Sequence, residues 1–311
     1  MGILLNAIIP LFCIILVGYL AEKFQVLGQN SFKILNEFVI KFPLPILIFS
    51  SIAGKHIKEI FNIPFMGAFS LVMFIPYAIV LWLGQKLREE PISKSAMRAL
   101  AVSNPNSGYI GIPVLGVLFG EQGIMIAAVA SFLTVFPSIT TILFCELGQH
   151  KEKKFTKICK HGAILFIKNP LMIATFLGVL CSSIALPLPT FFTKFITLLG
   201  NVAGPCALFA LGQMIVGQSI TKRTKEIGLN TIIKLGIQPF LAFSLLMLFH
   251  ADPVWAKGGI ILSGLPTAMA LTIFASYYKT YLQEATATIL ITTLCSIGTL
   301  LFLIWLIPMG S

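Results

Sequence analysis

The feature that most constrains this chain is a succession of apolar runs, each about 20 residues long, separated by short charged or turn-rich stretches. A helix needs about 20 mostly apolar residues to cross the hydrocarbon core of a bilayer. Only 11% of the residues are charged, against about 25% in soluble proteins, and the mean hydropathy is +0.94. Such a chain cannot form the polar surface of a soluble enzyme, a disordered protein or a disulfide scaffold. The sequence predicts an all-α integral membrane protein in a lipid bilayer.

Ten apolar runs are expected to be transmembrane helices. They cover residues 3–21, 32–53, 62–86, 95–119, 122–147, 169–187, 191–218, 227–249, 256–278 and 285–307. The longest polar stretch, 150–168, divides them into two sets of five. We therefore expect one membrane domain over 1–311, with a first repeat at 1–149, a connecting loop at 150–168 and a second repeat at 169–311.

Lysine and arginine are distributed unevenly between the loops. If the N-terminus is outside, sixteen of them fall on the inner side and four on the outer side. Because cytoplasmic loops carry the excess of basic residues, we expect a multi-pass protein of the cell membrane with both termini outside and a cytoplasmic central loop. The same topology accounts for the net charge of +11, so no nucleic-acid partner is expected.

The two halves share landmarks at a nearly constant offset. The matching pairs are Gly18 and Gly178, Phe49 and Phe209, Pro105 and Pro266, and Pro76 and Pro239, at offsets of 160, 160, 161 and 163 residues. Five spans per half is an odd number, so the second half must enter the membrane from the opposite side. The sequence therefore predicts a 5+5 inverted-topology repeat, a plan common among secondary transporters.

Spans four and nine are interrupted at corresponding places. Residues 103–113 contain two prolines, two glycines and several small polar residues, and residues 258–267 contain three glycines and a proline. Proline removes a backbone donor, and freed backbone groups inside a membrane must face protein or a water-filled cavity. We therefore expect broken, crossed helices that meet near the membrane midplane, where such transporters bind substrate. The alternative is a pair of proline kinks that only help the helices to pack.

The chemistry of these interruptions favours an organic anion. Half-helix N-termini carry partial positive charge, and the Asn106 amide can donate to a carboxylate without burying a full charge. No Asp or Glu lies in the middle of either broken span, which argues against a sodium/proton antiporter. The candidate substrate-binding residues are Ser103, Asn104, Pro105, Asn106 and Ser107 in the first broken span, and Gly264, Pro266, Thr267 and Met269 in the second.

Three more polar residues lie inside spans. Lys41 follows Glu37 by four residues, so it either faces the substrate or forms a neutralised pair. Gln213 lies in the middle of span seven and is added to the candidate site. Lys234 lies nearer a cytoplasmic end, and we expect its side chain to reach toward the interface. No metal site and no cofactor are expected.

Residues 104–113, Asn-Pro-Asn-Ser-Gly-Tyr-Ile-Gly-Ile-Pro, followed by Phe-Gly-Glu-Gln-Gly at 119–123, resemble the fourth-span signature of the auxin efflux carrier family. Gly-Leu-Pro at 264–266 and Lys-Asn-Pro at 168–170 are similar to further landmarks of that family. The resemblance implies a ten-span fold related to the sodium/bile acid symporters. It also implies a scaffold of spans one, two, six and seven, a moving domain built from the other spans, and a contact between Asn106 and a substrate carboxylate. The short central loop departs from the plant members.

The expected function is secondary active or facilitative transport of small organic anions, such as malate, malonate or auxin-like acids. An intramembrane enzyme would need a nucleophile–base set or a metal cluster, and the chain has no H-E-x-x-H or G-x-S-x-G motif. A channel or a membrane sensor without transport is the alternative. The sequence leaves open the coupling ion (proton or sodium) and a homodimer through the scaffold helices.

Overall fold

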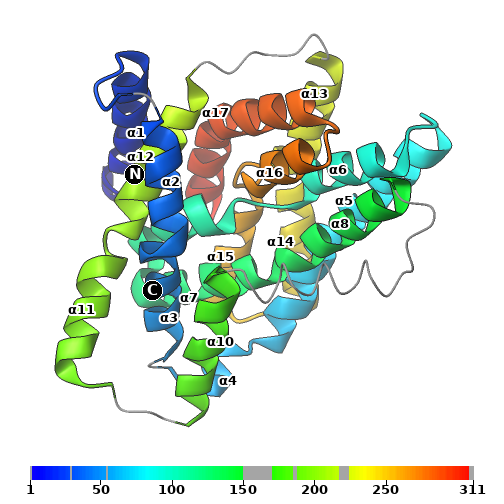
Figure 1. The fold of residues 1–311 in the computed structure, drawn as a ribbon. Helices are drawn as coiled ribbons and strands as arrows, with labels where there is room; N and C mark the ends of the chain where they lie inside the picture. Colours follow the sequence, from blue (N-terminus) through cyan, green and yellow to red (C-terminus); the bar gives the residue numbers. More distant parts are fainter. Residues whose placement is uncertain are drawn as a thin grey trace. The chain divides into compact units, whose positions relative to one another are not determined.

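The computed structural model describes residues 2–28, 30–53, 55–149, 170–184, 188–216 and 224–307 (Figure 1). The predicted loop at 150–168 lies outside these residues. Within them the chain is helical, and the one extended pairing is an isolated antiparallel bridge between Pro105 and Thr267. The predicted all-α class is therefore confirmed.

Several described segments are long and apolar enough to cross a membrane. They are Ile63–Lys86, Ser107–Gly148, Thr190–Ile215, Thr224–Leu248 and Leu282–Leu306. The 42 residues of Ser107–Gly148 suffice for two crossings at about 1.5 Å per residue. Its chain direction changes at Gly120, whose φ of 59° interrupts the helix and suits glycine. The protein is thus a multi-pass helical membrane protein.

The chain folds into two compact units. Unit 1 comprises Met1–Asn62, Ser107–Phe132 and Lys168–Gln218, and unit 2 comprises Ile63–Asn106, Leu133–Ile167 and Ser219–Ser311. Unit 1 contains the four spans that the resemblance assigns to a scaffold, and residues 107–132 in addition.

Unit 1 is built from paired helices. They are α1 (Gly2–Lys23), α2 (Ser31–Lys41), α3 (Pro43–Ala53), the short α4 (Ile57–Ile60), the π-helix η1 (Ser107–Gly111), nearly all of α7 (Ile112–Leu133), α10 (Pro170–Ser183), α11 (Thr190–Gly200) and α12 (Ala203–Ile215). Predicted spans two and seven are each divided into two helices. The division between α2 and α3 falls at Phe42 because two prolines follow it closely and remove backbone donors.

Glycines allow two close helix contacts within unit 1. Helix α1 packs on α12, where a Cβ on Gly18 would lie 2.1 Å from the carbonyl oxygen of Phe209. Helix α10 packs on α3, where a Cβ on Gly178 would lie 3.0 Å from the Cβ of Ile52 and 3.3 Å from the carbonyl oxygen of Phe49. Small residues let helix backbones approach in this way in membrane proteins.

Unit 2 holds the remaining helices. They are α5 (Ile63–Lys86), α6 (Ile92–Ser103), α8 (Val135–Gln149), α13 (Thr224–Ile232), the π-helix η2 (Ile233–Ile237), α14 (Gln238–Leu248), α15 (Pro253–Ser263), α16 (Ala270–Tyr277) and α17 (Leu282–Leu306). Helix α5 packs on α6, α14 and α15. The rings of Phe65 and Phe69 stack at 5.2 Å, and Phe65 meets Trp255 at 4.9 Å, so aromatic packing fixes this part of the core.

Candidate functional site

The chain leaves its helices at both predicted interruptions, and the segments of unit 2 that follow α6 and α15 are hydrogen-bonded to each other. Helix α6 ends at Ser103 and α15 ends at Ser263. We call residues 104–106 and 265–268 the paired segments. The backbone amide of Asn106 donates to the backbone carbonyl of Pro266 at 2.9 Å, and the backbone amide of Ala268 donates to the backbone carbonyl of Asn104 at 2.9 Å. Proline has no amide hydrogen and so cannot donate within a helix. The extended backbone of the paired segments accommodates Pro105 and Pro266, because neither proline has to donate there.

Side chains tie the paired segments to their surroundings. The Thr267 hydroxyl donates to the Ala101 carbonyl at 2.6 Å, and the Thr267 amide donates to the Thr292 hydroxyl on α17 at 3.2 Å. Gly264 also faces α17, because a Cβ at this position would lie 2.4 Å from Cδ1 of Leu303. The Thr267 hydrogen bonds restrain the second paired segment. Residue 264 has to be small because α17 packs closely against it.

Asn104 is held by an oriented hydrogen bond. Its side-chain nitrogen donates to the Ser138 hydroxyl on α8 at 3.2 Å, while that hydroxyl donates to the Thr134 carbonyl at 2.9 Å. The hydroxyl proton is therefore already used, which fixes the Asn104 amide with its nitrogen toward Ser138. The Oδ1 atom of Asn104 is buried and has no hydrogen-bond donor.

The structure brings most of the predicted site residues together in unit 2. They are Ser103, Asn104, Pro105, Asn106, Gly264, Pro266, Thr267 and Met269. The side chains of this set carry amides and hydroxyls and no carboxylate, and all of its members are buried. Ser107 follows directly in the chain, as the first residue of η1 in unit 1.

The other two predicted site residues lie in unit 1 and each has a partner there. Lys41 pairs with Glu37 at 2.8 Å on an exposed face of α2, the i, i+4 geometry that the sequence allowed. The Gln213 amide nitrogen, on α12, donates to the Glu22 carboxylate at 3.0 Å and to the Ser31 hydroxyl at 2.8 Å. Gln213 thereby joins α12 to the chain around α1 and α2.

Sequence reasoning missed a polar stripe along α13, η2 and α14. Asn230, Lys234 and Gln238 are spaced four residues apart, so they share one face of a helix whose remainder is mostly apolar. The side-chain nitrogen of Asn230 donates to the Tyr281 hydroxyl at 2.9 Å. The side-chain nitrogen of Lys234 donates to the Ser263 carbonyl at 2.7 Å. The side-chain nitrogen of Gln238 donates to the Ser103 carbonyl at 2.6 Å. This i, i+4, i+8 spacing is the signal that could have revealed the stripe.

The prediction that Lys234 reaches toward the interface is wrong. Its side chain is 0% exposed and its ammonium lies against the last residue of α15. The polar stripe supplies the physical reason: the carbonyl at the end of an interrupted helix offers an acceptor inside the protein, so the amine need not extend to water.

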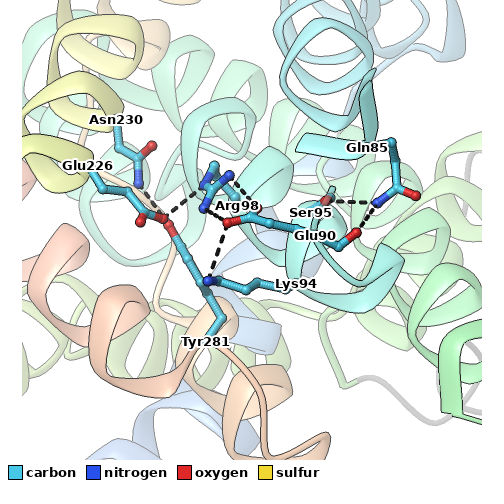
Figure 2. A network of polar contacts seen from close by, with 8 residues as sticks. All are labelled: Gln85, Glu90, Lys94, Ser95, Arg98, Glu226, Asn230 and Tyr281. Carbon is cyan, nitrogen blue, oxygen red and sulfur yellow. Dashed lines mark hydrogen bonds and ion pairs between the residues drawn. The ribbon is translucent and has the colours of Figure 1, made fainter. Parts of the chain in front are cut away.

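An ion network holds α6, the first half of the interrupted fourth span (Figure 2). Arg98 donates to both Glu90 carboxylate oxygens, at 2.5 and 2.7 Å, and to Glu226 on α13 at 2.8 Å. Lys94 pairs with the same Glu90 carboxylate at 3.3 Å. The Arg98 guanidinium also lies 5.9 Å from the Tyr281 ring. The network joins α6, α13 and the start of α17, and so fixes the helix that leads into the first paired segment.

The network changes the acid strength of Glu90, which lies in the connection between α5 and α6. Burial would raise the pKa of this carboxyl, but hydrogen bonds from Arg98 and the charges of Arg98 and Lys94 outweigh burial and lower the pKa below its usual value. Glu90 is therefore ionised at neutral pH.

Comparison with known proteins places the chain among membrane transporters. The family described as membrane transport protein matches residues 3–304. A protein of Rhizobium meliloti named "Putative malonate transporter" is 28% identical, over 98% of this chain and 96% of its own length. The "Uncharacterized transporter YfdV" of Escherichia coli is 22% identical over 92% of each chain. The mouse "Lysosomal cholesterol signaling protein" is 24% identical over 98% of this chain, which spans 37% of that protein.

The family match covers nearly every residue of the chain, and it agrees with the resemblance that the motifs at 104–113 and 264–266 indicated. These motifs encode a helical membrane protein in which two spans are interrupted at prolines. The chain segments that contain the two prolines pair with each other. The chain belongs to the membrane transport protein family, the family of the auxin efflux carriers.

Proposed function

We propose that this membrane transporter is a secondary carrier for small organic anions, with carboxylates such as malate, malonate or auxin-like acids as its substrate class. It works in the cell membrane by an elevator-type alternating-access motion, driven by a gradient of the anion itself or of a coupled ion. Its ten spans form a 5+5 inverted repeat, with both termini outside and the 150–168 loop in the cytoplasm.

The observation that carries the proposal is the chemistry of the paired segments. Two interrupted spans bring Asn106 and Thr267 to neighbouring positions in unit 2, the Asn106 side chain carries a neutral amide, and no carboxylate lies between 103 and 113 or between 258 and 269. A carboxylate substrate needs hydrogen-bond donors in a site shielded from water, and a protein carboxylate there would repel it. A site for a metal cation would instead be expected to contain such a carboxylate.

Symmetric contacts in unit 1 support the inverted repeat. Gly18 meets Phe209, and Gly178 meets Phe49. Adding 160 to the number of Gly18 and subtracting 160 from that of Phe209 converts the first contact into the second. Two repeats related by a pseudo-two-fold axis exchange contacts in this way, and an inverted repeat is such an arrangement.

Two further observations fit a carrier. The relative from Rhizobium meliloti is named as a malonate transporter, and malonate is a small dicarboxylate. The division of the chain into two compact units supplies the two bodies that an elevator motion needs.

Uptake by purified protein in liposomes tests the proposal. Saturable uptake of a radiolabelled mono- or dicarboxylate, accelerated by unlabelled substrate on the opposite side, is expected for a carrier. A channel gives flux that does not saturate in this range and is not accelerated by counter-substrate. No uptake for any member of a panel of malate, malonate, succinate, lactate and indole-3-acetate would contradict the proposal.

The second candidate is a membrane sensor without transport, and the similarity to the mouse signalling protein favours it. A sensor of this kind would bind a ligand and be stabilised by it, yet catalyse no exchange across the liposome membrane. Measuring ligand-induced thermal stabilisation beside uptake on the same preparation separates the two candidates.

A further inference from the structure

Two buried side-chain amides of unit 2 are held in one orientation by their partners. The nitrogen of Asn104 faces the Ser138 hydroxyl, whose hydrogen is already donated to the Thr134 carbonyl. The nitrogen of Gln238 faces the backbone carbonyl of Ser103 at 2.6 Å, and a carbonyl can only accept. Neither amide can turn round without losing its hydrogen bond. The oxygens of both amides are therefore fixed as acceptors.

Neither of these fixed oxygens receives a hydrogen bond within the part of the chain that the structure describes. Asn104 is 3% exposed and Gln238 is 0% exposed, so both oxygens are shielded from bulk water. A buried acceptor without a donor is costly, and buried polar groups in proteins almost always have a partner. The two oxygens are therefore suited to a ligand group that carries a hydrogen.

The fixed oxygens lie beside the donor proposed for the anion. The Ser103 carbonyl that binds Gln238 belongs to the peptide bond leading into Asn104, so the Gln238 amide adjoins the first paired segment. The Asn106 side-chain nitrogen is buried in the same segment and is the donor proposed for the substrate carboxylate. Asn104 and Asn106 are two residues apart in an extended stretch, which separates their Cα atoms by about 7 Å. That separation suits a small molecule with a carboxylate and a hydrogen-bond donor on neighbouring carbon atoms.

A hydroxyl is the donor that matches the fixed oxygens. The second carboxyl of succinate or malonate is ionised at neutral pH and has no hydrogen to donate. An ammonium would bring a full positive charge into a buried site, and no carboxylate lies between 103 and 113 or between 258 and 269 to balance it. A hydroxyl is neutral and donates one hydrogen.

We propose that the fixed oxygens recognise a hydroxyl of the substrate, with Asn104 Oδ1 as the principal acceptor, and that the carrier prefers 2-hydroxycarboxylates such as malate and lactate to the same acids without the hydroxyl. This inference rests on the proposed transport of organic anions. Asn106 donates to the carboxylate and Asn104 accepts from the hydroxyl, so Asn104 is a specificity-determining residue.

Calorimetric binding to purified protein in micelles tests the proposal with three ligands that share one carbon skeleton. L-Malate has a hydroxyl at the second carbon, succinate a hydrogen and L-aspartate an ammonium. Lactate, propionate and alanine repeat the comparison for monocarboxylates. The hydroxy acid should bind about 5- to 150-fold more tightly than the acid that leaves one buried acceptor unpaired. Equal affinities for malate and succinate and for lactate and propionate, or tighter binding of the amino acids, would overturn the proposal.

Three variants locate the preference. Asn104→Leu removes the acceptor at similar volume, so it should weaken binding of the hydroxy acid by the same factor and leave that of the other acid close to wild type. Ser138→Ala keeps Asn104 but releases its amide, and should reduce the preference with less effect on the fold. Gln85→Leu is the matched control and should keep the wild-type preference. Gln85 is a half-buried amide that binds the Glu90 carbonyl and the Ser95 hydroxyl near the start of α6, away from the paired segments.

The variants also separate recognition from structural support. An equal loss of affinity for both acids in Asn104→Leu and Ser138→Ala, with a lower melting temperature, would overturn the proposal, because it would mean that Asn104 only supports the fold. The same equal loss is expected if a buried water, rather than the substrate, binds the fixed oxygens. Failure of the wild type to bind any of the six ligands would instead contradict the proposed function, on which this preference depends.

Discussion

Replacing Arg98 by methionine should cost about 3–5 kcal/mol of unfolding free energy, the loss expected when one member of a buried ion network is removed. The Arg98 side chain is 4% exposed and makes three hydrogen bonds to carboxylates, at 2.5, 2.7 and 2.8 Å. Each hydrogen bond to a charged group contributes about 1.5–3 kcal/mol. The full sum is not expected because the Glu90 and Glu226 side chains, 13% and 10% exposed, regain part of their hydration when the arginine is gone.

Lys94 provides the matched control for this prediction. It pairs with the same Glu90 carboxylate, but at 3.3 Å and with a side chain that is 21% exposed. A partly exposed pair of this kind contributes about 1 kcal/mol or less, so Lys94→Met should be far milder than Arg98→Met.

Equilibrium unfolding in mixed micelles measures both variants, with folding followed by tryptophan fluorescence. A double-mutant cycle with Glu226→Gln isolates one arm of the network and should return a coupling of about 0.5–3 kcal/mol. If Arg98→Met and Lys94→Met cost the same, or if the coupling is zero, the network shown in Figure 2 does not hold α6 to α13 and α17 as argued.

Three further predictions concern pH, packing and topology. Because the pKa of Glu90 is lowered in the folded protein, its contribution to stability is complete above the ordinary carboxylate pKa and is lost as pH falls through the lowered value. The difference in unfolding free energy between wild type and Glu90→Gln should therefore vanish in acid. A difference that persists at the lowest pH would contradict the network. Gly18→Ala should cost about 1–3 kcal/mol because its Cβ would strike the Phe209 carbonyl, whereas Gly228→Ala, with no atom within 4 Å, should be neutral or slightly stabilising; equal effects in unfolding experiments would refute the close contact. A single cysteine at position 154 of a cysteine-free variant should resist an impermeant thiol reagent in intact cells, and ready labelling from outside would reverse the proposed orientation.

The sequence predicted where α6 and α15 end because the effect of proline on a helix is local. Pro105 and Pro266 cannot donate within a helix, and both helices do end just before them. It also anticipated the Glu37–Lys41 pair, because residues four apart on a helix must be neighbours. These features depend on short stretches of chain.

The features that the sequence did not reveal depend on which segments meet in three dimensions. Nothing near Lys234 in the chain indicates that the carbonyl of Ser263 lies beside it. The network of Arg98 and Glu226 joins residues 128 positions apart, and their packing cannot be read from either local pattern. Lys234 was misjudged because reaching for water is the usual behaviour of a lysine near a membrane boundary, and an internal acceptor was not foreseen.

The division of span four between the two units was also unexpected. The chain passes from unit 2 to unit 1 between Asn106 and Ser107, inside a span that the sequence treats as one element. Periodicity identifies an apolar run, but not the body to which each half of an interrupted run belongs.

The most direct test of the proposed anion site measures substrate affinity and melting temperature on the same purified variants of Asn106. If Asn106 donates to the substrate carboxylate, Asn106→Ala should lose one hydrogen bond to a charged group, about 1.5–3 kcal/mol or about 10- to 150-fold in affinity, with little change in melting temperature. Asn106→Asp should bind more weakly still because it sets like charge against the carboxylate. Unchanged affinity together with a lower melting temperature in Asn106→Ala would contradict the account, because it would mean that Asn106 only supports the fold of the paired segments.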